Sequence, residues 1–302
     1  MPNTEIHPDL QQAARFLPRG GIGPRTAAIA RRIQPLLVPR ARGVHTEQVG
    51  DISIRLHSPA VPPAAGGAAM LWIHGGGYVL GTASQDDLLC TKVTRELGVT
   101  VAAVDYRLAP KHPFPTPLED CYAALKWLAV QTFTDPSRIA IGGASAGGGL
   151  AAALALLARD RGEISVAFQL LAYPMIDDRT ALRRDIDQRG FRLWNNRANA
   201  YGWRAYTGLE PGDPAVDKYA APARHPDLAG LPPTWIGVGT QDLFHDEDIE
   251  YADRLRAAGV PVELEVVPGA FHGFDAVAPK AAVTHAFRDS QLAALRGALL
   301  PA

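Results

Sequence analysis

A serine between glycines, set where a predicted strand meets a predicted helix, constrains this chain more than any other feature. The pentapeptide Gly143-Ala144-Ser145-Ala146-Gly147 follows the β-rich run 139–142 and precedes the helix-forming run 150–159. A sharp strand-to-helix turn exposes a serine hydroxyl at the end of a sheet, and flanking glycines leave room for the close crossing. The pattern predicts Ser145 as a nucleophile, although a serine among glycines is also typical of an ordinary turn or helix cap.

A second glycine-rich segment lies upstream of this serine. Residues 68–73 form an apolar run typical of a buried strand, and His74-Gly75-Gly76-Gly77 follows directly. Consecutive glycines at a strand end let backbone N–H groups approach a ligand closely, as a developing oxyanion requires. A flexible linker would be polar and rich in serine, whereas this segment lies between apolar runs. We therefore expect an oxyanion-binding loop.

A nucleophilic serine needs a histidine base, which in strand-turn-helix hydrolases follows both the serine and an acidic residue in the chain. His272 is the best candidate, because it stands in the glycine-bounded loop 268–274 after the alternating strand pattern of 260–267. His285 falls in a helix-like stretch, His225 in a proline-bounded loop, and His245 follows the acid candidate Asp242 too closely in the sequence.

Two aspartates compete for the acid that orients the histidine. Asp242 ends the predicted strand that begins with 234–238, whereas Asp246 opens the next predicted helix. An aspartate at a helix start is most often an N-cap, so we favour Asp242 and keep Asp246 as the alternative.

In these motifs the chain resembles a known family, the bacterial hormone-sensitive-lipase-like esterases (family IV) of the α/β-hydrolase superfamily. The resemblance extends in order from about Trp72 to Phe274. It rests on the blocks His74-Gly75-Gly76-Gly77, Asp105-Tyr106-Arg107-Leu108-Ala109-Pro110-Lys111-His112-Pro113-Phe114-Pro115, Gly143-Ala144-Ser145-Ala146-Gly147-Gly148, Tyr173-Pro174, Asp242-Leu243-Phe244-His245-Asp246-Glu247 and His272-Gly273-Phe274.

The resemblance implies an α/β-hydrolase fold: a mostly parallel central sheet with helices on both faces and a helical cap. It also implies Ser145 as nucleophile, His272 as general base and acid, and Asp242 as the orienting carboxylate. Many relatives carry an acidic residue where this chain has Ala144, so the pH dependence stays open. The implied oxyanion donors are the N–H groups of Gly76, Gly77 and Ala146, with His74 and Gly75 shaping the loop.

The implied domain organisation is one catalytic domain at 46–302, an N-terminal cap segment at 1–45 and a cap insertion at about 177–215. We expect the N-terminal helix to cover apolar surface with Ile29, Ile33, Leu36 and Leu37. The aromatic residues of 177–207 line an acyl pocket or simply pack the cap; they are Phe191, Trp194, Tyr201, Trp203 and Tyr206.

Composition excludes several other classes of protein. Apolar residues make up 47% of the 302 residues, enough for a large core, and the net charge of −1 offers no footprint for nucleic acid or anionic membrane. Cys90 and Cys121 lie in predicted helices and are expected to be buried free thiols. The uncharged run 139–158 reads as a strand plus a helix, not as a membrane span. The first 16 residues lack the apolar core of a signal peptide, so a cytoplasmic protein is expected.

No cofactor or metal is expected. The match of 147–152 to a dinucleotide fingerprint has the wrong context, and no histidine pair has metal-ligand spacing. The overall prediction is a serine carboxylesterase that hydrolyses small-molecule esters of short to medium acyl chains through an acyl-enzyme. A non-catalytic receptor on the same fold and an amide hydrolase are the alternatives. A homodimer, the natural substrate and the enantioselectivity stay open.

Overall fold

The computed structural model describes residues 5–20, 22–37, 41, 43–61 and 66–300. Its centre is an eight-stranded sheet in the order β1-β2-β4-β3-β5-β6-β7-β8. The pairs β1/β2 and β2/β4 are antiparallel, and every later neighbouring pair is parallel, which confirms the predicted mostly parallel sheet. The strands are β1 (His45–Val49), β2 (Ile52–His57), β3 (Gly67–Ile73), β4 (Thr100–Asp105), β5 (Thr134–Ala144), β6 (Phe168–Ala172), β7 (Thr234–Gln241) and β8 (Val262–Phe271).

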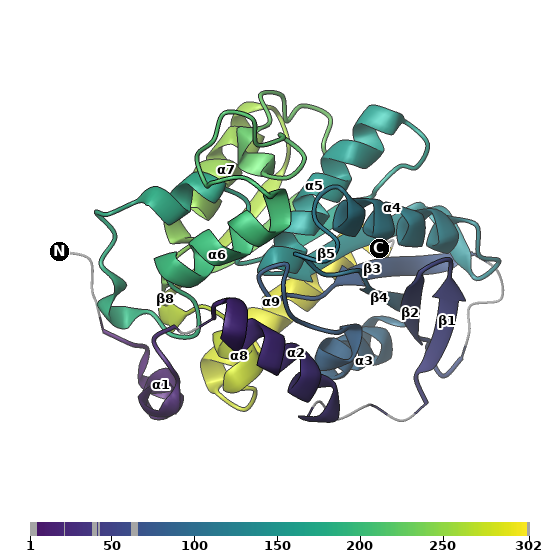
Figure 1. Cartoon of the computed structure of the whole chain (residues 1–302). Coiled ribbons are helices and arrows are strands. Elements are labelled where there is room, and N and C mark those ends of the chain that lie inside the picture. The colour runs from purple at the N-terminus through teal and green to yellow at the C-terminus, as the bar shows by residue number, and fades with distance from the viewer. Residues whose placement is uncertain (1–4, 21, 38–40, 42, 62–65, 301–302) are drawn as a thin grey trace.

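Helices cover both faces of the sheet, as Figure 1 shows. Successive side chains of a strand point to opposite faces, so Leu71 and Ile73 pack toward α4, α5 and α7, while Met70 and Trp72 pack toward α3, α8 and α9. The helices are α1 (Gln11–Phe16), α2 (Pro24–Leu37), α3 (Asp87–Leu97), α4 (Thr116–Ala129), α5 (Ala146–Arg161), α6 (Asn196–Thr207), α7 (His245–Ala257), α8 (Phe274–Val277) and α9 (Ala282–Leu299). Short 3-10 turns are η1 (Pro8–Leu10), η2 (Ala83–Asp86), η3 (Asp178–Leu182), η4 (Gln188–Gly190) and η5 (Pro222–Arg224).

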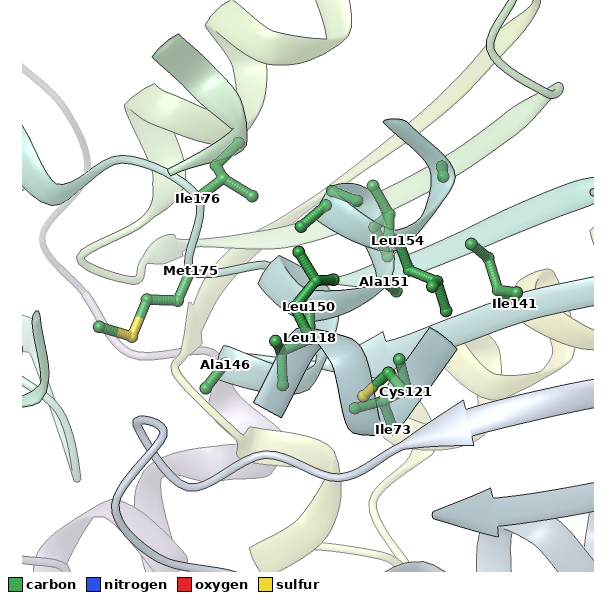
Figure 2. Packing of buried hydrophobic residues seen from close by; sticks show 14 of the residues in the cluster. Ile73, Leu118, Cys121, Ile141, Ala146, Leu150, Ala151, Leu154, Met175 and Ile176 are labelled. Atoms are coloured by element: carbon green, nitrogen blue, oxygen red, sulfur yellow. The ribbon is translucent and has the colours of Figure 1, made fainter. Parts of the chain in front are cut away.

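Helix α5 begins directly after Ser145 and is buried along most of its length. All of its residues from Ala146 to Ala158 are buried, and Leu150 and Leu154 lie among apolar side chains of β5 and α4 (Figure 2). This burial explains why the run 139–158 carries no charge: it is the end of one strand and most of one helix. Among the helices of the described ranges, none is long and apolar enough to cross a membrane.

The ends of β7 and β8 differ from the sequence prediction. The run 268–271 was expected as a loop but continues β8, and Gln241 pairs with Phe271 after an irregularity in the register. Pro268 made this extension hard to predict from the sequence, because proline is unusual inside a strand and favours a bulge. Asp242 and His272 therefore stand directly beyond two paired strand ends.

The N-terminal segment contacts the segment that was expected as a cap insertion. The N–H of Leu193 donates to the carbonyl of Pro18 at 2.8 Å, and the guanidinium of Arg192 donates to the carbonyl of Ala14 at 2.8 Å. In Figure 1 the N-terminal end of the purple α2 lies next to the green α6, whereas α1 lies farther from it. That the two segments act together as a cap remains a prediction.

The expectation that Ile29 and Ile33 cover apolar surface was wrong. Their exposed fractions are 58% and 43%, whereas Ala27 is fully buried. At 100° per residue, both isoleucines lie on the side of α2 opposite Ala27, so the helix turns them outward. The side chains of Leu36 and Leu37 lie outside the described part of the structure. The buried apolar residues in the described part of the N-terminal segment are instead Leu10, Ala14 and Ala27.

The two cysteines are buried free thiols, as predicted. Cys90 lies on α3 and Cys121 on α4, in core clusters on opposite faces of the sheet.

Candidate active site

Ser145 occupies the turn between β5 and α5 in a backbone conformation that is rare outside glycine, with φ 57° and ψ −123°. Strain of this kind persists only where the surroundings fix it. The Ser145 N–H donates to the carbonyl of Ala172 at 2.9 Å, and its carbonyl accepts from the N–H groups of Gly149 and Met175. A Cβ atom at Gly147 would overlap the carbonyl oxygen of Ile73, which explains why glycine stands there.

The structure brings Ser145, His272 and Asp242 together in one hydrogen-bonded chain. Ser145 Oγ lies 2.8 Å from His272 Nε2, and His272 Nδ1 lies 2.8 Å from Asp242 Oδ2. All three are buried, and the second oxygen of Asp242 accepts from the N–H of Phe244 at 3.0 Å. A carboxylate at Nδ1 favours the tautomer whose Nε2 can accept the serine proton. The arrangement is able to activate a serine hydroxyl.

Aromatic rings fix the orientation of the His272 imidazole. Phe244 meets it edge-on with ring centroids 5.1 Å apart, and Tyr173 does the same at 4.9 Å. These rings exclude water from the histidine, so its interaction with the carboxylate acts in a medium of low dielectric.

The first turn of α7 holds two buried acids, Glu247 and Asp248, which the sequence reasoning missed. Glu247 accepts the N–H groups of Ile176 and Asp177 at 2.9 and 3.2 Å. Burial raises the pKa of Glu247 well above its usual value, and burial together with the charges of Glu247 and Asp242 raises the pKa of Asp248. The sequence signal was three consecutive acids, a pattern that ordinarily indicates an exposed helix start.

Asp246, the alternative acid, points away from the histidine site. Its carboxylate accepts from Arg183 at 2.8 Å and contacts His245, and its side chain is 54% exposed. Burial acts to raise the pKa of Asp246, but the hydrogen bonds from His245 and Arg183 lower it below its usual value. The expectation of a helix N-cap was also wrong, since α7 begins at His245 and its N-cap residue is Phe244.

The expected oxyanion loop lies against Ser145. A Cβ atom at Gly75 would sit 3.3 Å from the Ser145 Cβ, and Gly76 adopts φ +133°, where a side chain is strained. Among the described residues, none accepts a hydrogen bond from the N–H of Gly76 or Gly77. Ala146 is the first residue of α5, so its N–H has no partner within the helix. Three backbone donors are thus available close to the serine.

His74 supports this loop from inside the protein. Its ring is fully buried, stacks on Tyr106 at 4.3 Å and contacts the carbonyl of Gly75 through Nδ1 at 2.9 Å. Burial lowers the pKa of His74, against the charge of Asp105, so the ring is neutral at ordinary pH. The Tyr106 hydroxyl donates to the His74 carbonyl at 3.1 Å. These contacts hold the strand end from which the glycines leave.

A cavity of about 510 Å³ opens onto Ser145 and His272. Trp194, one of the aromatic residues that sequence reasoning considered for an acyl pocket, lines it, whereas Trp203 and Tyr206 are buried in the core against Tyr78. Sequence reasoning missed Asp86, which also lines the cavity. The full lining is Pro18, Gly20, Ile22, Gly75, Gly76, Gly77, Leu80, Gln85, Asp86, Ala144, Ser145, Tyr173, Leu193, Trp194, His272, Gly273 and Ala276.

No group of three histidine, cysteine or acidic side chains within the described ranges could hold a metal ion.

The chain was compared with known proteins. Residues 70–276 match the model of a family described by its alpha/beta hydrolase fold. Esterase LipI of Mycobacterium tuberculosis is 37% identical over 74% of this chain and 71% of its own length. An ethyl acetate hydrolase of Pseudomonas putida is 36% identical with the same coverage. Among solved structures, a bacterial heroin esterase superposes with a TM-score of 0.88 at 40% identity and covers 98% of both chains.

Proposed function

We propose a substrate range and a residue-level mechanism from one premise: this chain belongs to the hormone-sensitive-lipase-like esterases of the α/β-hydrolase fold and is a carboxylic-ester hydrolase. The observation that carries the mechanism is the hydrogen-bonded chain from Ser145 through His272 to Asp242.

In the acylation step, Ser145 Oγ attacks the ester carbonyl while His272 Nε2 takes its proton. The Asp242 carboxylate, 2.8 Å from Nδ1, stabilises the imidazolium that forms. The tetrahedral oxyanion accepts hydrogen bonds from the N–H groups of Gly76, Gly77 and Ala146. The carbon–oxygen bond to the alcohol then breaks, and the imidazolium returns its proton to the leaving alkoxide.

In the deacylation step, water takes the place of the alcohol. His272 removes a proton from water, the hydroxide attacks the acyl carbon, and the second tetrahedral intermediate expels Ser145 Oγ, which recovers its proton from the imidazolium. The products are a carboxylic acid and the free enzyme. Each proton moves between Nε2 and an oxygen, so the mechanism needs no group beyond the residues named.

The proposed substrates are esters with acyl chains of about four to eight carbons. A cavity of about 510 Å³ has room for a short chain, and Pro18, Ile22, Leu193 and Trp194 give it apolar walls. Each buried methylene adds up to about 0.8 kcal/mol until the cavity is full, after which longer chains gain nothing. The Pseudomonas putida relative is named for ethyl acetate, an ester with a two-carbon acyl group.

A panel of p-nitrophenyl esters from two to sixteen carbons tests this proposal. We expect kcat/KM to rise to an optimum between four and eight carbons and then fall. The Ser145→Ala variant, with an unchanged circular dichroism spectrum, should hydrolyse none of them at an appreciable rate. An optimum at acyl chains of twelve to sixteen carbons would overturn the substrate range, and full activity of Ser145→Ala would overturn the mechanism.

The same residues are able to attack an amide, so an amide hydrolase is the second candidate. The p-nitroanilides that match the best esters distinguish the two, because an ester preference of many orders of magnitude supports esterase function. The receptor alternative loses its support, since the relatives are hydrolases by name and His272 stands within reach of the serine.

A further inference from the structure

Asp86 is a carboxyl group in the candidate active-site cavity to which the mechanism gives no role. It ends the η2 turn just before α3 and lines the same cavity as Ser145 and His272. Its Oδ2 accepts a hydrogen bond from the indole of Trp72 at 2.8 Å. The described residues donate no hydrogen bond to Oδ1. The side chain is therefore held in place by one oxygen while the other stays available to a ligand.

The surroundings of Asp86 make this carboxyl unusual. Of the described residues that line the cavity, it is the one acid, and no lysine or arginine lies among them. Most of the remaining wall is apolar or aromatic, with Tyr173 and Trp194 beside the serine and histidine. A lone carboxylate in such a cavity attracts a cation, and aromatic faces add to that attraction. A neutral apolar substrate would instead remove water from the carboxylate without supplying a hydrogen bond or an ion pair in its place.

We propose that Asp86 selects esters that carry an ammonium group, whose charge it meets inside the cavity while Ser145 attacks the ester carbonyl. The inference rests on the proposed function, because it assigns Asp86 to the substrate cavity of that same site. Asp86 would be a specificity-determining residue and would take no part in proton transfer.

The charges around Asp86 set the pH at which it acts. The pKa of Asp86 is raised to about 7, chiefly by burial. The hydrogen bond from Trp72 and the charge of Arg288 lower this pKa, whereas the charges of Asp275 and Asp87 raise it further. Asp87 forms an ion pair with Arg55 at 2.6 Å. Asp275 accepts a hydrogen bond from the Tyr173 hydroxyl at 2.6 Å and lies 3.9 Å from Arg288. The nearby Cys90, Tyr106 and Tyr173 are neutral, because burial raises their pKa values. The carboxylate should therefore form as the pH rises through about 7.

The test uses pairs of esters that differ only in charge. Each trimethylammonio ester is compared with the tert-butyl isostere in which carbon replaces nitrogen. The charged group is placed on the alcohol side or the acyl side, with two, three or four methylenes as spacer. The measured quantity is the kcat/KM of the cationic ester divided by that of its neutral isostere. Any loss of active enzyme, and any effect of pH on the step that both esters share, therefore cancels.

We expect the wild-type ratio to reach about tenfold for at least one spacer, since a desolvated cation in such a site gains about that factor. The ratio should rise with pH through about 7, because the trimethylammonio charge does not titrate and the Asp86 carboxyl does. In Asp86→Asn, which keeps an oxygen for Trp72, the ratio should fall to near one and become independent of pH. In Asp86→Glu it should stay above one.

Asp289→Asn is the matched control, because it removes an acid that is 68% exposed on α9 and is not part of the cavity lining. Its ratio should equal that of the wild type. A wild-type ratio near one for every spacer, or an unchanged ratio in Asp86→Asn, would overturn the role of Asp86. Hydrolysis of the neutral esters in that case would leave the proposed function standing, whereas failure to hydrolyse any ester would count against the proposed function itself.

Discussion

At the scale of single residues, the candidate site depends on two hydrogen bonds of 2.8 Å that meet on one imidazole. Position decides the role of each acid near that ring. Asp242 faces Nδ1 and is buried, whereas Asp246 pairs with Arg183 at the surface, although only three residues separate them. The two carboxylates therefore interact with different strength, because one lies in a dry interior and the other in water.

The two acids give the first prediction. Asp242→Asn should lower kcat by about 10⁴, because an amide at Nδ1 favours the wrong imidazole tautomer. Asp246→Asn loses only an exposed ion pair and should change stability by less than about 1 kcal/mol, with kcat near the wild-type value. Steady-state kinetics on both variants checks this. The opposite order of effects would move the orienting acid to Asp246.

The backbone donors of the oxyanion loop give the second prediction. Proline at Gly76 is a poor probe, because that residue has φ +133° and proline requires about −65°. Glycolic acid incorporated at Gly77 replaces the N–H with an ester oxygen and leaves the chain geometry intact. Loss of one donor should lower kcat by about 10² to 10³ with little change in KM. A change in KM alone would mean that the loop binds substrate without stabilising the transition state.

At the scale of elements, the serine turn exists because β5, β3 and α5 approach one another more closely than side chains permit. Gly147 lies where a Cβ atom would meet the carbonyl oxygens of Ile73 and His74, and Gly143 lies against the backbone of Gly147. The first turn of α5 is thereby pressed onto the strand that leads into the glycine loop. Two segments that are about 70 residues apart in sequence so form one rigid corner.

A pair of glycine substitutions gives the third prediction. Gly147→Ala puts a methyl group into backbone atoms that cannot move aside, so it should lower the free energy of unfolding by about 1–3 kcal/mol or more. Gly297→Ala, in the exposed interior of α9 with open space around it, should raise that free energy by about 0.5–1 kcal/mol. Urea denaturation measures both. Equal effects would show that the corner is not close-packed in solution.

At the scale of the whole molecule, the N-terminal segment and residues 177–215 both reach the cavity, through Pro18, Gly20 and Ile22 from one and Leu193 and Trp194 from the other. The hydrogen bond from Leu193 to Pro18 joins them there. Segments outside the central sheet therefore form part of the cavity wall, which favours their proposed role as a cap.

The anchoring of the N-terminal segment gives the fourth prediction. Leu10→Ala removes a fully buried side chain and should lower the free energy of unfolding by about 2–5 kcal/mol. Ile29→Ala truncates a side chain that is 58% exposed and should change it by less than about 0.5 kcal/mol. Leu10→Ala should also weaken the acyl-chain preference, because the segment that bears Pro18 and Ile22 loosens. An unchanged chain-length profile in a destabilised Leu10→Ala protein would separate this segment from the cavity.

The sequence by itself determined the features that follow from local pattern and order along the chain. The resemblance carried by its motifs implied the mostly parallel sheet, and the motifs around Ser145, Asp242 and His272 marked residues that the fold then brings together. Only the tertiary structure decided which side chains share a cavity or an interior. It turned Ile29 outward, extended β8 to Phe271, left Asp246 at the surface and placed Asp86 in the same cavity as the serine. Such outcomes depend on contacts between residues far apart in the chain, and burial and charge environment exist only once those contacts have formed.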